Sequence, residues 1–181
     1  MGVALVSSWP TGHAGGIFSD PPELEALATR FLAQRARRDE RVLFVAEAQT
    51  PRRWPEELVE QGVLVLGSVG EVYAPLRDGD VTSQRSVFAE ALAGALRDGF
   101  QGLCVAADNT GMVIEGLDRW LEWEQVAAEL MADSPVNGLC CFDRTLLALG
   151  ATHRLALVHP TLVGEGAPVE PSPQGCAPSP R

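Results

Sequence analysis

The chain has 181 residues, of which 46% are hydrophobic. It contains 14 basic and 24 acidic residues, which gives a net charge of −10 at pH 7. Every basic residue is an arginine, which excludes a Schiff-base lysine and the lysine of a phosphate-binding loop. An acidic chain is a poor partner for a phosphate backbone, and no run approaches the length of a membrane span, so we expect neither nucleic-acid nor membrane binding.

The first half of the chain predicts two strands and two helices. Asp20, Pro21 and Glu23 have the pattern of an N-cap, a first-turn proline and a capping-box acid, and apolar residues at helical spacing follow them. The continuous apolar run Val42–Ala46 is typical of a strand that is buried on both faces. A helix opening at Thr50 and a short strand over residues 63–66 complete this half.

The second half continues the alternation of strands and helices. Its predicted elements are a helix capped by Thr82, a strand Gly102–Ala107, a helix Leu117–Met131, a strand Val136–Phe142, a short helix near Arg144–Leu149 and a last strand near Leu155–Val158. This alternation predicts an α/β fold with a mostly parallel sheet flanked by helices. We expect a flexible N-terminus over residues 1–12, a single domain over residues 13–163 and a disordered Pro/Gly-rich tail over residues 164–181.

Polar side chains stand where several of the predicted strands end. The residues at these positions are Glu47, Ser68, Asp108, Asn109 and Asp143. Because ligands of open parallel sheets bind outside the carboxyl ends of the strands, these residues are candidates for a binding site. The alternative is that they only cap helices and face solvent, as acids at strand ends commonly do.

Glu124 is a more specific candidate, because it falls on the apolar face of its predicted helix with Leu117, Leu121 and Ala128. A carboxylate in such a stripe must be paired, protonated or lining a cavity. Two interpretations remain open: a functional acid, or a core acid satisfied by a buried arginine or a backbone donor. Glu122 points roughly the opposite way, so the two do not form a catalytic pair.

The four cysteines of the chain have no zinc-site spacing, and three lie in apolar, strand-like runs. We therefore expect reduced core thiols in a cytoplasmic protein. Cys140 and Cys141 are neighbours on a strand, so their side chains point to opposite faces and at most one of them reaches a given pocket.

The histidines and two tryptophans are weaker signals. His13 precedes a short apolar segment and is a candidate only in combination with other residues. His153 and His159 flank the last predicted strand and are interpreted as structural or surface groups. Trp120 and Trp123 lie beside the Glu124 face and are expected in the core or at an interface.

Taken together, these segments resemble the MEDS family, a sensory domain named for methanogens, methylotrophs and the dichloromethane regulator. The resemblance runs from His13 to Val163. Its carriers are His13 before a strand, Asp20–Glu25, Arg41–Val45, Gly99–Val105, Asp108–Met112, Leu121–Glu124, Leu139–Arg144 and His159–Pro160. Family members often carry a cysteine two residues after the first histidine; here that position is Gly15.

The resemblance implies a RecA/KaiC-like domain without a phosphate-binding loop that senses a small molecule, with hydrocarbon derivatives proposed as ligands. It also implies a separate signalling partner, such as a kinase, a STAS-type protein or a transcription regulator. We expect no catalysis and a small organic ligand at the carboxyl edge of the sheet. The candidate lining consists of His13, Glu47, Asp108, Asn109, Met112, Glu124 and Asp143. The residues assign no metal and no cofactor.

Two other functions stay open. One is a scaffold without a ligand that self-associates and uses its tryptophans as interface anchors. The other is a residual nucleotide hydrolase, in which acids at the strand ends hold Mg²⁺ and arginines meet the phosphate charge.

Overall fold

The computed structural model of the chain describes residues 9, 11–46, 64–159 and 161–164. Within them, six parallel strands form one sheet in the order β3-β2-β4-β5-β1-β6. In chain order the strands are β1 (His13–Phe18), β2 (Glu40–Val45), β3 (Leu64–Gly67), β4 (Gly102–Asp108), β5 (Val136–Asp143) and β6 (Thr161–Val163). The predicted α/β fold with a parallel sheet is confirmed.

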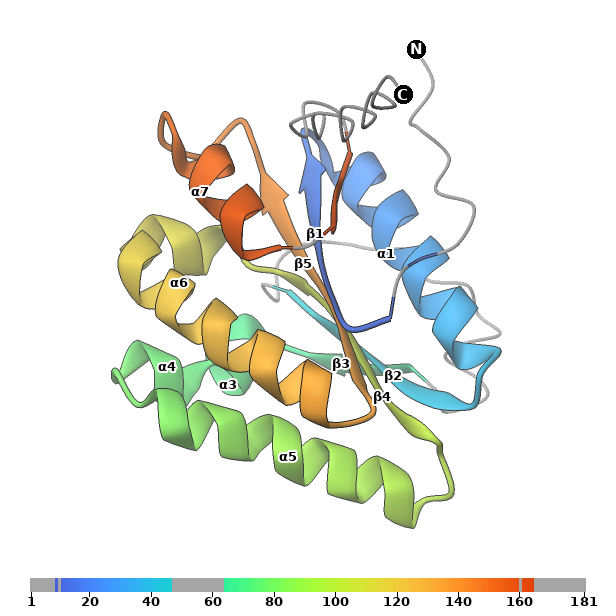
Figure 1. Cartoon of the computed structure of the whole chain (residues 1–181). Coiled ribbons are helices and arrows are strands. Elements are labelled where there is room, and N and C mark those ends of the chain that lie inside the picture. The colour runs from blue at the N-terminus through green and yellow to red at the C-terminus, as the bar shows by residue number, and fades with distance from the viewer. Residues whose placement is uncertain (1–8, 10, 47–63, 160, 165–181) are drawn as a thin grey trace, which may run out of the picture.

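Helices cover both faces of the sheet, as Figure 1 shows. The helices are α1 (Pro21–Ala36), α3 (Val69–Val72), α4 (Ala74–Arg77), α5 (Val81–Arg97), α6 (Thr110–Asp133) and α7 (Ala151–Val158). On one face α1 packs against side chains such as Phe44, Cys104 and Cys141. On the other face α5 and α6 cover Val105 and Cys140. None of these helices is long and apolar enough to cross a membrane.

The start of α1 is the one the sequence predicts. The Asp20 carboxylate accepts a hydrogen bond from the Glu23 backbone N–H at 2.8 Å, and the Glu23 carboxylate accepts one from the Ser19 N–H at 2.7 Å. These bonds satisfy backbone donors that a helix start leaves without partners.

The prediction was wrong after Asp143. The expected helix at Arg144–Leu149 is a turn, because the Asp143 carboxylate accepts hydrogen bonds from both the backbone and the hydroxyl of Thr145. The expected strand at Leu155–Val158 is the end of α7, and the last strand is β6. A short apolar run fits a strand or a helix equally well. Here Ala151 and Leu155, which are four residues apart and so lie on one face of a helix, are both buried, and the segment is helical.

Two helix boundaries also differ from expectation. Asp80, not Thr82, caps α5, since its side chain accepts a hydrogen bond from the Ser83 N–H at 2.8 Å. Helix α6 begins at Thr110 and has a break at Gly116, whose backbone is extended, before the regular stretch that the sequence predicts. The helix expected from Thr50 lies outside the described residues, as do most of the expected flexible N-terminus and tail.

Candidate functional site: a buried His-Glu-Cys-His cluster

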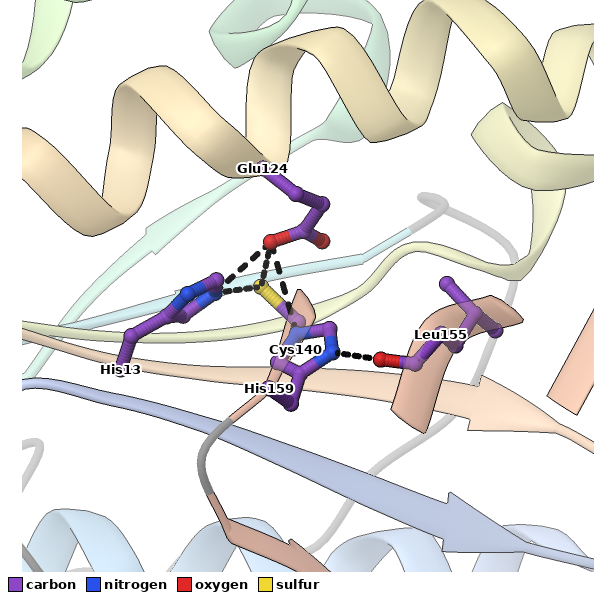
Figure 2. Close-up of polar contacts among 5 residues, drawn as sticks. All are labelled: His13, Glu124, Cys140, Leu155 and His159. Carbon is purple, nitrogen blue, oxygen red and sulfur yellow. Dashed lines mark hydrogen bonds and ion pairs between the residues drawn. The ribbon is translucent and has the colours of Figure 1, made fainter. Parts of the chain in front are cut away.

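Four polar side chains from four parts of the chain meet beneath α6, in the face of the sheet that this helix covers. His13 begins β1, Cys140 lies in β5, Glu124 projects from α6, and His159 follows α7 (Figure 2). All four are buried, with exposed fractions between 0% and 6%. Their ligating atoms all lie within 4.8 Å of one another.

One carboxylate oxygen is the centre of this cluster. Glu124 Oε2 lies 2.7 Å from His13 Nε2, 3.4 Å from His159 Nε2 and 3.8 Å from Cys140 Sγ. The thiol is also 3.5 Å from His13 Nε2. The dashed lines in Figure 2 converge on this oxygen.

The parallel register brings His13 and Cys140 to the same face. His13 pairs with Gly138 and Gly15 pairs with Cys140, so the imidazole and the thiol stand two residues apart on neighbouring strands and point the same way. The start of β1 is held in place by Asn137, whose side-chain oxygen accepts a hydrogen bond from the Gly12 N–H at 2.7 Å.

The orientation of His159 is set by the end of α7. Its Nδ1 lies 2.8 Å from the Leu155 carbonyl oxygen (Figure 2). A carbonyl oxygen only accepts, so Nδ1 carries the proton and donates it. Nε2 is therefore the nitrogen that faces Glu124.

The electrostatic environment of the cluster favours the charged form of the buried Glu124 carboxylate. Burial by itself would raise the pKa of Glu124, but attraction by His159 and His13, with their hydrogen bonds, outweighs it and holds the pKa well below the usual range. Burial lowers the pKa of His159, but Glu124 and the Leu155 carbonyl raise it above its ordinary value. Burial, followed by the charges of Glu124 and Cys141, raises the pKa of the Cys140 thiol.

Three buried polar atoms of the cluster make no hydrogen bond. They are His13 Nδ1, Glu124 Oε1 and His159 Nε2. Buried polar atoms without a hydrogen-bond partner are uncommon in folded proteins, and a bound ion or a functional role is a frequent reason. Of these atoms, His159 Nε2 faces into the cluster and Glu124 Oε1 belongs to its central carboxylate.

An apolar cavity adjoins the cluster between α6 and the sheet. It has a volume of about 20 Å³, and its walls include Tyr73, Phe88, Trp123, Met131 and Cys140. A wider, open groove of about 480 Å³ lies at the amino edge of the sheet, where His13 and Met131 are among the lining residues. Met131 and Val136 belong to both walls, so these two side chains lie where the groove adjoins the cavity.

The structure brings together two of the seven residues predicted for the site, His13 and Glu124. Glu124 is paired, which is one of the three possibilities that the sequence leaves open, but its partners are two histidines and not an arginine or a backbone donor. Asp108 and Asp143 lie at the carboxyl edge and are joined through Thr110: its hydroxyl donates to Asp108 at 2.8 Å and accepts from the Asp143 N–H at 2.9 Å.

The remaining predicted residues are placed differently. Asn109 is fully buried, and neither atom of its side-chain amide has a hydrogen-bond partner. Burial raises the pKa of both Tyr73 and Cys140, and the nearby Asn109 amide offsets only part of that rise. Met112 is a core residue on the α6 side of the sheet. Glu47 lies outside the described residues.

Sequence reasoning missed Cys140 and His159. Cys140 was placed correctly on one face of its strand, opposite to Cys141, but nothing in the sequence linked that face to His13. The sequence predicts His159 as a structural or surface group beside a last strand, whereas the residue follows α7 and joins the cluster. Trp120 and Trp123 are only 1% and 2% exposed, so their predicted core role is confirmed and neither presents an anchor to a partner.

Comparison with known proteins agrees with the sequence pattern. The family model described as "MEthanogen/methylotroph, DcmR Sensory domain" (MEDS) matches residues 12–160. No curated protein and no solved structure matches the chain. The matched segment includes all four residues of the cluster, all of β1–β5 and every helix described above. The chain therefore belongs to the MEDS family of sensory domains.

Proposed function

We propose that this domain senses a small, largely apolar molecule that binds in the cavity between α6 and the sheet. The observation that carries the proposal is the composition of the cavity wall: aromatic and aliphatic side chains surround it, and a single thiol, Cys140, joins it to the polar cluster. An apolar pocket with a few polar groups on one side is the usual form of a small-molecule site.

The cavity limits the size of the ligand. A volume of about 20 Å³ holds roughly one water-sized group, so a ligand of a few heavy atoms needs a wall that moves. Met131 is such a wall, since methionine is unbranched and adapts its shape readily. Small hydrocarbon derivatives, which the MEDS resemblance implies, have the required size and polarity.

Two connections would carry the bound state to the surface. At the carboxyl edge, Thr110 joins the start of α6 to Asp108 and Asp143, and buried Asn109 lies next to Cys140. On the other side of the cluster, His159 Nδ1 donates a hydrogen bond to the Leu155 carbonyl oxygen in α7. A ligand that favours one position of α6 would shift both regions, and a separate signalling protein would read the change. The proposal contains no catalytic step.

The first test measures binding of two small probes that differ in polarity, dichloromethane and methanol. The probe signal is the ¹³C-methyl resonance of Met131. We expect dichloromethane to shift this resonance with saturation and methanol to leave it unchanged. Hydrogen exchange in α7 should change only with the probe that binds. Equal, non-saturating shifts with both probes would contradict an apolar site.

Two neighbouring alanines provide a matched pair of variants. Ala127 lines the cavity and Ala128 lines the open groove. Ala127→Val should fill the cavity and weaken dichloromethane binding at least tenfold, whereas Ala128→Val, with the same helix-propensity cost, should leave it unchanged. If both variants bind as the wild type does, the ligand does not occupy this cavity.

We also propose a cytoplasmic location, on the ground that Cys104, Cys140 and Cys141 are all buried and that Cys104 and Cys140 are free thiols. Acid-quenched thiol titration of the protein taken directly from cells tests this. All three should be found reduced, and a disulfide in which any of them takes part would contradict the proposal.

A further inference from the structure

We propose that His13, Glu124, Cys140 and His159 form a binding site for one divalent transition-metal ion, with Zn²⁺ as the best match. This site stands on the geometry of the four side chains and does not depend on the proposed apolar ligand. The four residues are far apart in the sequence, so they do not form one of the short spacing motifs that are typical of zinc sites.

The distances suit a tetrahedral ion. Zn–N, Zn–O and Zn–S bond lengths imply that the ligand atoms of a tetrahedral site stand about 3.3 to 3.6 Å apart. Two contacts fall in this range: 3.4 Å between His159 Nε2 and Glu124 Oε2, and 3.5 Å between His13 Nε2 and Cys140 Sγ. The third, 3.8 Å between Cys140 Sγ and Glu124 Oε2, is slightly longer, so an ion would draw these two atoms together. The fourth, 2.7 Å between His13 Nε2 and Glu124 Oε2, is a hydrogen bond that an ion would replace after a small outward shift.

The types of donor atom point to the same class of ion. Two imidazole nitrogens, one carboxylate oxygen and one thiolate sulfur are borderline donors that suit Zn²⁺ and its neighbours, and they are unsuited to Mg²⁺ or Ca²⁺. A bound dication would balance the charges of the carboxylate and the thiolate, leaving the buried site neutral.

His159 carries the arrangement that is typical of a metal-binding histidine. One ring nitrogen, Nδ1, donates to a backbone carbonyl, and the other, Nε2, faces the cluster without a hydrogen bond. Such a bond fixes the tautomer and leaves the lone pair of Nε2 for an ion. This fully buried nitrogen makes no hydrogen bond and has only the 3.4 Å ion-pair contact with Glu124, an observation separate from the clustering of the four residues.

An ion has a route to this site. The groove at the amino edge of the sheet reaches His13 from solvent, and its volume of about 480 Å³ admits hydrated ions. Cys140 is a member of both the cluster and the cavity wall. If the proposed function holds as well, a molecule in the cavity would contact a ligand of the metal.

The test loads the full-length, metal-free protein with Co²⁺ and follows its absorption spectrum. We expect one ion per chain, intense d–d bands of tetrahedral coordination, and a thiolate-to-cobalt charge-transfer band. Cys140→Ala should remove the charge-transfer band, whereas Cys141→Ala, at the next residue on the opposite face, should retain it. A charge-transfer band that persists in Cys140→Ala would overturn the assignment.

Two further pairs separate ligation from general damage to the fold. Glu124→Gln and His159→Ala should each weaken Zn²⁺ binding by more than about tenfold in competition with a chelator. Their controls, Glu122→Gln and His153→Ala, change exposed residues of the same two regions and should leave the affinity unchanged. Equal losses in the controls would count against the site.

A measurement on the wild type covers the case in which a variant does not fold. X-ray absorption of the zinc-loaded protein should show one sulfur at about 2.3 Å and three nitrogen or oxygen neighbours at about 2.0 to 2.2 Å. A spectrum without sulfur, or failure to bind Zn²⁺ at one equivalent, would overturn the proposal even if dichloromethane binds. Zinc binding without a response to dichloromethane would instead contradict only the proposed sensing function.

Discussion

Gly15 and Cys140 lie directly opposite each other in the pairing of β1 with β5, and the space beside Gly15 is taken by the ring of His159. A Cβ atom at Gly15 would stand 3.0 Å from His159 Cγ and 2.5 Å from Leu162 Cδ1. Members of the family often carry a cysteine at this position. In this chain the thiol comes from the neighbouring strand, and the vacated space admits a second imidazole.

Gly15→Ala should therefore displace His159 from the cluster. We expect a loss of about 1 to 3 kcal/mol in the free energy of unfolding, because the added methyl overpacks the core. Zn²⁺ binding should weaken in parallel. Gly16→Ala is the control: its Cβ would meet Cys141 Sγ at 3.3 Å, on the other face of the sheet. Urea denaturation of both variants measures the loss of unfolding free energy, and metal titration measures the loss of zinc affinity. Equal zinc affinities in the two variants would refute the role assigned to Gly15.

Met131 controls access to Cys140, since it lies between the open groove and the cavity. It rests on Gly138, where a Cβ atom would come within 2.3 Å of its terminal methyl. Met131→Ala should join the groove to the cavity and speed the alkylation of Cys140 at least tenfold. Cys104 and Cys141, both fully buried, serve as internal controls whose rates stay constant in the same sample. Peptide mass spectrometry over time gives all three rates, and a uniform increase would indicate loosening of the whole fold instead.

A buried polar network supports the strand that carries His13. The Glu40 carboxylate lies 3.4 Å from Arg35 Nη1 and accepts a hydrogen bond from the Asn137 amide at 3.0 Å. Asn137 in turn binds the backbone at Gly12. Glu40→Ala leaves a fully buried arginine without this carboxylate, and we expect it to cost about 3 kcal/mol in unfolding free energy.

The control for Glu40 is Asp98, whose ion pair with Arg41 is largely exposed. Asp98→Ala should cost less than about 1 kcal/mol, since solvent screens such pairs. Both values come from urea denaturation at one pH. If the two substitutions cost the same, the buried network does not hold the start of the sheet as described.

The cap of α5 predicts a pH dependence of stability. Hydrogen bonds from the Ser83 hydroxyl and backbone hold the pKa of Asp80 below its ordinary value of 3.8. A lowered pKa means that the charged cap stabilises the fold fully above the ordinary value, and that this contribution is lost as pH falls through the lowered one. Asp80→Asn keeps an oxygen acceptor but does not titrate, so its Tm should approach that of the wild type as the pH drops below about 4.

Thr82→Ala tests the competing position of the cap. Its Tm should track the wild type at every pH, because Asp80 and not Thr82 accepts the hydrogen bond at the helix start. A loss of Tm in Thr82→Ala that is the same at every pH, with none in Asp80→Asn, would move the cap to the position that the sequence suggested.

Much of the fold could be read from local patterns. The N-cap at Asp20, the buried runs that became β2, β4 and β5, and the long helix from Leu117 onward all depend on residues close together in the chain. Short-range rules act on such segments directly. These rules fail where a strand and a helix satisfy the same pattern. The run Leu155–Val158 is such a case, and packing against the rest of the protein favours the helix.

By itself the sequence determined the parallel α/β fold, the family, and the fact that Glu124 must be paired, protonated or lining a cavity. Only the tertiary structure decided that Glu124 is paired, and with which partners. His13, Cys140 and His159 are separated by up to 146 residues, and what brings them to one oxygen is the strand order β5-β1-β6 with its register. Neither strand order nor register leaves a trace in local periodicity, because both are settled by long-range pairing and by the packing of α6 and α7 on the finished sheet.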